Sequence, residues 1–245
     1  NINSDGSQTL ISFQASTLDW KATAEFESNL SERLDIISHN SSSDFTIKLS
    51  GRSLILAQVT ADVAESAVIS TATVAGVILI MLSGINTFRK KDIIKGVSRG
   101  FVTWIPLMVV VTWVYGIMGL TGYQLNSQTV TIGALTLGLG VDYAVHLTTR
   151  LEEEVEFAPT SDPNEWTTKS VATTGRAMFG AALTTAGGFS VLNFSSLVPL
   201  QLFGQVFVVA IIFALISSLL LLPALYTPFL KQDAKDYLNR TEESE

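Results

Sequence analysis

The sequence predicts an α-helical membrane protein in which five transmembrane helices follow part of an external α+β domain. Apolar residues make up 47% of the chain and charged residues only 15%, whereas soluble domains carry about 25% charged residues. The deficit of charge is concentrated after residue 65. Five apolar runs lie there, each near the ~20 residues that a helix needs to cross the hydrocarbon. They are residues 66–84, 101–120, 130–148, 177–197 and 202–226.

These runs are predicted to be helices rather than strands. They show no period-two alternation of polar and apolar residues, and in lipid only helices and closed barrels satisfy the backbone. A buried helix of a soluble protein is usually shorter and carries a polar stripe. Pro223, late in the last run, predicts a kink there. We therefore expect a five-helix membrane domain over residues 66–230, with a tail over 231–245.

Residues 1–65 have a different, mixed pattern. Ile11 and Phe13 alternate with polar residues, as do the apolar positions of "DFTIKLSG" at 44–51, which is typical of half-buried strands. Between them, helical spacing joins Phe26, Leu30, Leu34 and Ile37. "RSLILAQVTADVAESA" then predicts a helix that leads to the membrane. The order strand–helix–strand–helix indicates the end of a small α+β domain.

The positions of lysine and arginine predict the orientation. Three segments are basic, namely 86–100, 150–176 and the tail after 230, whereas "TGYQLNSQ" and "SSLVPLQ" carry no Lys or Arg. By the positive-inside rule the basic segments are cytoplasmic. Residues 1–65 are then outside and the C-terminus inside a multi-pass cytoplasmic membrane protein. An external first segment needs a preceding exporting segment, so we expect the chain to be part of a longer protein.

Composition argues against several classes of function. The net charge of −7 does not suggest a nucleic-acid partner, and the absence of cysteine excludes thiol catalysis and zinc–thiolate sites. No catalytic triad, phosphate loop or metal signature stands out. We expect neither an enzyme nor a cofactor.

Asp142 is the main candidate for a functional residue. It lies inside the third run, where an aspartate costs about 2.5–3.5 kcal/mol at the centre of an inserted helix. A partner or a wet cavity must offset that cost. Burial in a low dielectric favours the protonated carboxyl, so Asp142 is a candidate to load and release protons. The alternative is a structural acid that is hydrogen-bonded between helices.

Two neighbours of Asp142 are candidates for the same site. Tyr143 points roughly 100° around the helix from Asp142, so the two face different neighbours. Tyr143 is either a relay residue or a packing residue. His146 shares the Asp142 face at four-residue spacing. His146 either extends a relay or sits hydrogen-bonded near the interface.

Small and hydroxyl residues suggest how helices pack around Asp142. Ala134 and Gly138 fall on one stripe with Asp142, with Gly140 nearby, so we expect this face to meet another helix. In the fourth run, the hydroxyls of Thr184 and Thr185 could bond the carboxyl or a backbone carbonyl. Gly187 and Gly188 follow them and predict close packing or a looser helix.

These motifs together resemble the resistance–nodulation–division (RND) superfamily, closest to its MMPL-type and hydrophobe/amphiphile exporter branches. The segments that carry the resemblance are "GLGVDYAVHLTTRLEEE", "TTAGGF" and "FG…LLPAL", in the order and spacing of the family. The resemblance implies a ferredoxin-like porter domain before the five helices. It also implies a second RND half, which this chain lacks, that would hold the crosswise partners of the proton-relay pair Asp142 and Tyr143.

The resemblance implies proton-motive-force-driven export of hydrophobic or amphiphilic, lipid-like molecules, with membrane lipid around the helices. A SecD/SecF-like accessory subunit of protein export shares the fold and is the alternative. A lipid- or sterol-handling membrane protein without export is a further one. The Asp-Tyr pair and the "TTAGGF" helix favour the exporter.

Overall fold

The computed structural model describes residues 20–40, 52–123 and 129–242. It divides the chain into two compact units, residues 1–62 and 63–245. The first unit contains α1 (Trp20–Asn40) and the beginning of α2 (Arg52–Lys90). Both helices predicted there are confirmed. The two predicted strands lie outside the described residues, so the ferredoxin-like domain stays a prediction.

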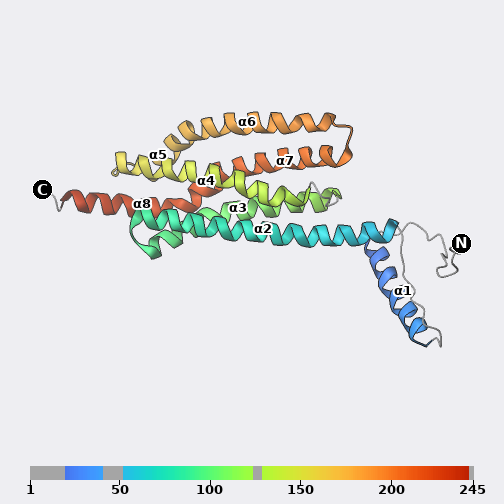
Figure 1. The fold of residues 1–245 in the computed structure, drawn as a ribbon. Coiled ribbons are helices and arrows are strands. Elements are labelled where there is room, and N and C mark those ends of the chain that lie inside the picture. Colours follow the sequence, from blue (N-terminus) through green and yellow to red (C-terminus); the bar gives the residue numbers. More distant parts are fainter. Residues whose placement is uncertain (1–19, 41–51, 124–128, 243–245) are drawn as a thin grey trace. The chain divides into compact units, whose positions relative to one another are not determined.

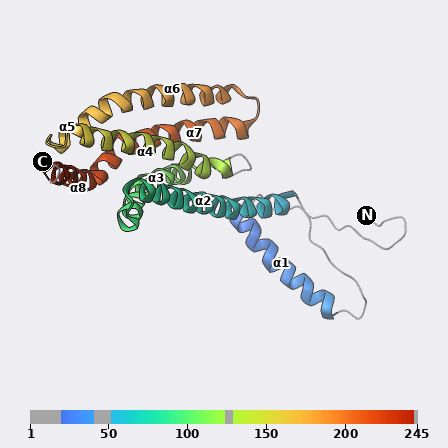
Figure 2. The same cartoon turned by 60° about the vertical axis from the view of Figure 1, so that its left-hand side comes forward.

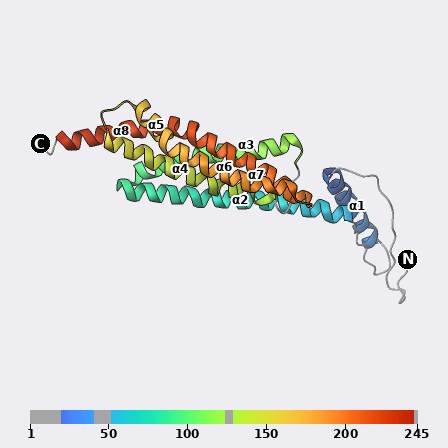
Figure 3. The same ribbon diagram turned by 90° about the horizontal axis from the view of Figure 1, so that it is seen from above.

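The second unit is a bundle of long helices that run side by side (Figures 1, 2 and 3). After α2 come α3 (Ile93–Thr121), α4 (Ile132–Phe157) and the short α5 (Pro163–Ser170). α6 (Arg176–Ser190), α7 (Val198–Ile216) and α8 (Leu222–Glu242) complete it. α2, α3 and α4 are longer than the apolar runs 66–84, 101–120 and 130–148, because polar residues at their ends continue the same helices. The part of the chain that the structure describes contains no strand.

Local signals explain where the helices begin. The side chain of Asp92 accepts hydrogen bonds from the backbone N–H groups of Ile94 and Lys95, which caps the N-terminus of α3. Asp162 caps α5 in the same way, and Pro163 follows it at the start of the helix. The chain turns sharply between α2 and α3, where only Lys91, with positive φ, and the capping Asp92 separate the two helices.

α4 lies at the centre of this unit. It packs against α3, α7 and α8, and α5 also contacts it. α6 instead packs along α7, and the two run as an adjacent pair in Figure 1. α2 meets α3 closely: the indole N–H of Trp104 donates to the carbonyl of Ala75, and a Cβ at Gly100 would come within 2.6 Å of the backbone of Ser83.

The last helical stretch is interrupted where the sequence predicts a kink. A π-helical turn, Ser217–Leu221, joins α7 to α8 immediately before Pro223. Proline has no N–H and its ring clashes with the carbonyl four residues earlier, so the regular α-helical bonding cannot continue through it. The buried hydroxyl of Ser217 donates to the carbonyl of Pro106 in α3, which fixes this turn against the neighbouring helix.

Among the described residues, four helical stretches are long and apolar enough to cross a membrane: 65–90, 93–121, 163–194 and 198–240. The helical membrane class is thus confirmed. The third predicted run, residues 130–148, forms α4, which is not among the four, and its Asp142 and His146 lower its mean hydropathy. Five crossings therefore remain a prediction.

Candidate functional site

Asp142 lies on an open face of α4. Its side chain is exposed, and so are Leu135, Gly138 and His146, which share its face at helical spacing. Within the described ranges Asp142 makes no hydrogen bond or ion pair. The carboxylate is therefore unpaired on a helix whose other faces are packed against α3, α7 and α8.

The small residues of α4 divide between two faces. A Cβ at Gly138 would meet no atom within 4 Å, so no helix of this chain covers that position. A Cβ at Gly140 would lie 2.9 Å from Cδ2 of Leu107, so this glycine allows α3 to approach. Ala134 is half-buried, whereas Gly138 is exposed and Gly140 is buried. The predicted helix contact at Gly140 is made within the chain, whereas the one at Gly138 is not.

Tyr143 does not face outward, contrary to the expectation that it points to a missing partner. Its side chain is only 6% exposed and belongs to the apolar core of the unit. A rotation of about 100° per residue moves it from the open face of Asp142 to the packed side of α4. Asp142 and Tyr143 thus lie next to each other in sequence but in different surroundings.

The hydroxyl residues of α6 lie away from Asp142. Thr184 donates to the carbonyl of Gly180 at 2.9 Å, and Thr185 donates to that of Ala181 at 2.9 Å. Each hydroxyl thus bonds within its own helix, the backbone alternative named from the sequence. Gly187 and Gly188 have open space where a Cβ would lie, so neither marks a close helix contact in this chain.

A second polar centre, which sequence reasoning missed, lies ten residues further along α4. Arg99 of α3 has no exposed surface. Its guanidinium binds both carboxylate oxygens of Asp233 in α8, at 2.7 and 2.8 Å, and also binds Glu152 of α4 at 3.1 Å. The same group lies 5.4 Å from the ring centre of Phe229 and 5.9 Å from that of Tyr226. Planar, weakly hydrated guanidinium suits such a buried, forked and stacked position.

Glu152 gathers donors from three other helices. Besides Arg99, it accepts from the hydroxyl of Tyr226 at 2.6 Å and pairs with Arg89 of α2 at 3.1 Å. Lys90 of α2 lies 4.0 Å from Glu152 and 2.8 Å from Asp233. We call Arg89, Lys90, Arg99, Glu152, Tyr226 and Asp233 the charge clasp, because together they tie α2, α3, α4 and α8 at one end.

The charge clasp brings together segments that the sequence analysis used only for counting charge. Arg89, Lys90 and Arg99 contributed to the basic loop, and Glu152 and Asp233 had no assigned role. The sequence does contain a signal. Glu152 follows the apolar run 130–148 and Asp233 follows the run 202–226, both on the predicted side of the basic loop. Which acid meets which base depends on helices that are distant in the sequence. Glu152 lies 53 residues from Arg99, and Asp233 lies 134 residues from it.

Metal ligation has no support in the described ranges, where no group of three or more His, Asp or Glu side chains could hold an ion. The arrangement instead offers one carboxylate without a partner among the described residues, on an open helix face, and one buried ionic cluster beyond it.

Comparison with known proteins identifies the family. The model of the MMPL family matches residues 8–232. The chain belongs to the MMPL family. A protein of Methanocaldococcus jannaschii that is named as a membrane protein, MJ1562, is 35% identical over 156 residues. That match covers 64% of this chain and 38% of the relative, so the chain spans well under half of the relative's length.

The match confirms the family resemblance that the helix motifs indicate, over nearly the whole chain.

Proposed function

We propose that this MMPL-family chain is one half of a proton-motive-force-driven transporter that exports hydrophobic or amphiphilic, lipid-like molecules from the cytoplasmic membrane. The observation that carries the proposal is the unpaired Asp142 on the open face of α4. The family supplies the transporter class, and Asp142 supplies the point at which a proton can act.

An unpaired carboxylate that faces lipid is costly in free energy, so we expect another protein surface to pack against this face. Gly138, one turn before Asp142, has open space around it and would let another helix approach closely. A second RND half, on the same longer chain or on another subunit, fits this requirement. The open face and the carboxylate then lie between two halves instead of in lipid.

Protonation of Asp142 would change the free energy of that interface. The charged form favours polar or wet surroundings, and the neutral form favours close apolar packing. Proton binding therefore biases two arrangements of the halves, and external domains attached to the helices would follow. His146 on the same face would support proton entry, whereas Tyr143 would support the site from the buried side of α4.

The proposed orientation places residues 1–65 outside and the C-terminus in the cytoplasm. It is supported by the meeting of the basic loop with the C-terminal segment, since Lys90 pairs with Asp233 and Lys95 pairs with Asp236. Since both segments lie at one end of the helices, they lie on one side of the membrane.

The test is proton movement through the full-length protein in liposomes that contain a pH-sensitive dye. A fluorescently labelled phosphatidylethanolamine serves as the amphiphilic probe. We expect the isosteric substitution Asp142→Asn to abolish probe-dependent proton movement, because the amide cannot titrate. Glu156→Gln is the matched control, since Glu156 is an exposed acid on the same helix outside the candidate site.

Two outcomes would contradict the proposal. Wild-type rates in Asp142→Asn would remove the proton role of this residue. A wild-type protein that moves protons without any dependence on the lipid probe would contradict the lipid-like class of substrate.

A further inference from the structure

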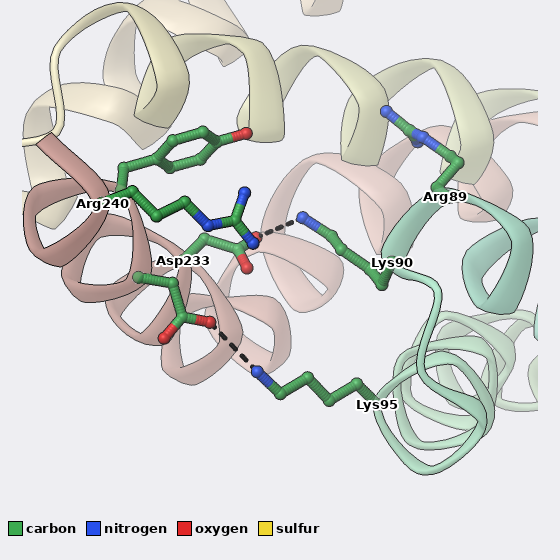
Figure 4. Close-up of a pocket in the computed structure, with 7 residues that line it drawn as sticks. Arg89, Lys90, Lys95, Asp233 and Arg240 are labelled. Atoms are coloured by element: carbon green, nitrogen blue, oxygen red, sulfur yellow. Dashed lines mark hydrogen bonds and ion pairs between the residues drawn. The ribbon is translucent and has the colours of Figure 1, made fainter. Parts of the chain in front are cut away.

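A polar recess opens beside the charge clasp, between α2, α3 and α8. It is lined by four cationic side chains, two aspartates and one tyrosine, and Figure 4 shows the ion pairs that cross it. The cations are Arg89, Lys90, Lys95 and Arg240. The described residues that line the recess include no aliphatic side chain, so the recess does not suit an apolar ligand.

The charges around the recess do not balance. The clasp contains three cations, Arg89, Lys90 and Arg99, against two carboxylates, Glu152 and Asp233. The neighbouring pair of Lys95 and Asp236 is neutral. Arg240 adds a further cation and makes no ion pair with any residue that the structure describes. Five cations therefore meet three acids, an excess of two positive charges.

This excess lies partly out of water. The side chain of Lys90 is 19% exposed and those of Glu152 and Asp233 are 7% exposed, so the carboxylates are committed to the clasp. Arg89, at 40%, keeps part of its surface accessible. An anion that enters the recess thus meets Arg240, which has no ion pair among the described residues, and the exposed parts of Arg89 and Lys95, which also bind Glu152 and Asp236. Asp233 is already neutralised by Lys90 and Arg99.

The recess also lies at the end of a candidate membrane span. Lys90, which lines it, is the last residue of the helical stretch 65–90 that is long and apolar enough to cross a membrane. The polar headgroup layer begins where the hydrocarbon ends. A basic pocket at the end of a span suits the phosphate of an anionic lipid.

We propose that this recess binds a phosphate group, held by Arg240 and Arg89 with Lys95 beside them. Guanidinium groups match phosphate oxygens by forked hydrogen bonds, and an ammonium adds a point charge. The phosphate comes either from an anionic lipid headgroup or from a soluble phosphate. The site does not depend on Asp142 carrying protons, so it stands apart from the proposed transport cycle.

The experiment measures binding to the full-length protein in detergent, by thermal shift and native mass spectrometry. The probes are phosphatidylglycerol, phosphatidylcholine and inorganic phosphate. The test variant is Arg240→Gln, which removes an exposed side chain and spares the clasp. Lys235→Gln is the matched control, because Lys235 is an exposed cation on the same helix that does not line the recess.

We expect phosphatidylglycerol to bind better than phosphatidylcholine and Arg240→Gln to weaken that binding by about fivefold, with Lys235→Gln close to wild type. An Arg240-dependent shift with inorganic phosphate assigns the site to soluble phosphate, and one seen only with phosphatidylglycerol assigns it to lipid. Equal losses in both variants, or no preference for anionic probes, would overturn the proposal. Arg89→Gln provides a second variant, expected to lower binding in the same direction.

Discussion

Two acids on α4 have opposite surroundings. Asp142, in the middle of the helix, is exposed on an open face and makes no ion pair within the described part of the chain. Glu152, near its end, is 8% exposed and takes bonds from Arg99, Arg89 and Tyr226. The same helix thus carries one carboxylate with several partners and one that has none among the described residues.

The difference separates structural acids from candidate functional ones. A buried carboxylate with three donors holds helices together, and its loss leaves other charges unpaired. A carboxylate without partners among the described residues, in the apolar part of a helix, shows no such structural role. Asp142 is therefore interpreted as a contact to something outside the chain, and Glu152 as part of its framework.

The largest expected loss of stability comes from removing the centre of the clasp. Arg99→Met should lower the free energy of unfolding by about 3 kcal/mol, because Glu152 and Asp233 lose a buried partner. Unfolding in mixed detergent micelles measures it. Lys169→Met is the control, since that lysine pairs with Glu165 at the surface of α5, where the two side chains are 47% and 49% exposed. Equal losses in the two variants would contradict the central role of Arg99.

Two glycines of α4 sharpen the comparison between packed and open faces. Gly133→Ala should cost about 1–3 kcal/mol, because its Cβ would lie 2.3 Å from Oγ1 of Thr71 and 2.4 Å from the hydroxyl of Tyr115. Those two oxygens are hydrogen-bonded at 3.1 Å, so the methyl group would separate them. The same unfolding measurement applies.

Gly138→Ala meets no atom of this chain and should not destabilise this unit. A loss of stability in the full-length protein would therefore measure packing by a second half against this face. A larger loss for Gly138→Ala than for Gly133→Ala, with the second half absent, would contradict the assignment of the two faces.

A smaller effect is expected at the rim of the recess. Lys95→Gln removes the ion pair with Asp236. The side chain of Lys95 is 37% exposed and that of Asp236 is 42% exposed. Exposed pairs contribute about 0.2–1 kcal/mol, so the loss of stability should stay within that range and shrink further in high salt. A loss as large as that of Arg99→Met would show that the rim belongs to the clasp.

Only a small effect on stability is expected for Asp142→Asn, within about 0.5 kcal/mol, although the same variant should abolish proton movement. Urea or detergent titration of the variant beside the wild type measures it. A clear destabilisation would indicate a structural acid, the alternative that the sequence leaves open.

Much of the fold could be predicted because the relevant signals are local. Apolar runs of membrane length, the helical spacing around Leu30 and the position of Pro223 each depend on a few neighbouring residues. Helix α1, the membrane helices and the interruption before Pro223 follow these signals. The family motifs are also local strings, and the MMPL match over residues 8–232 confirms them.

The candidate site was less predictable because helix faces depend on distant contacts. Sequence spacing correctly separates Asp142 from Tyr143 by about 100°, but it does not say which of the two faces the core. Packing of α3, α7 and α8 around α4 puts Tyr143 inside and leaves Asp142 outside. Likewise, α6 lies along α7, which keeps Thr184 and Thr185 away from α4.

The sequence by itself thus determines a helical membrane protein of the MMPL family with an isolated aspartate in one apolar run. Only the tertiary structure decides that Arg99, counted at first among loop cations, is the buried centre of an ionic clasp. The physical reason is range: hydropathy and helix periodicity act over a few turns, whereas the partners of Arg99 lie 53 and 134 residues away and meet it only when the helices pack.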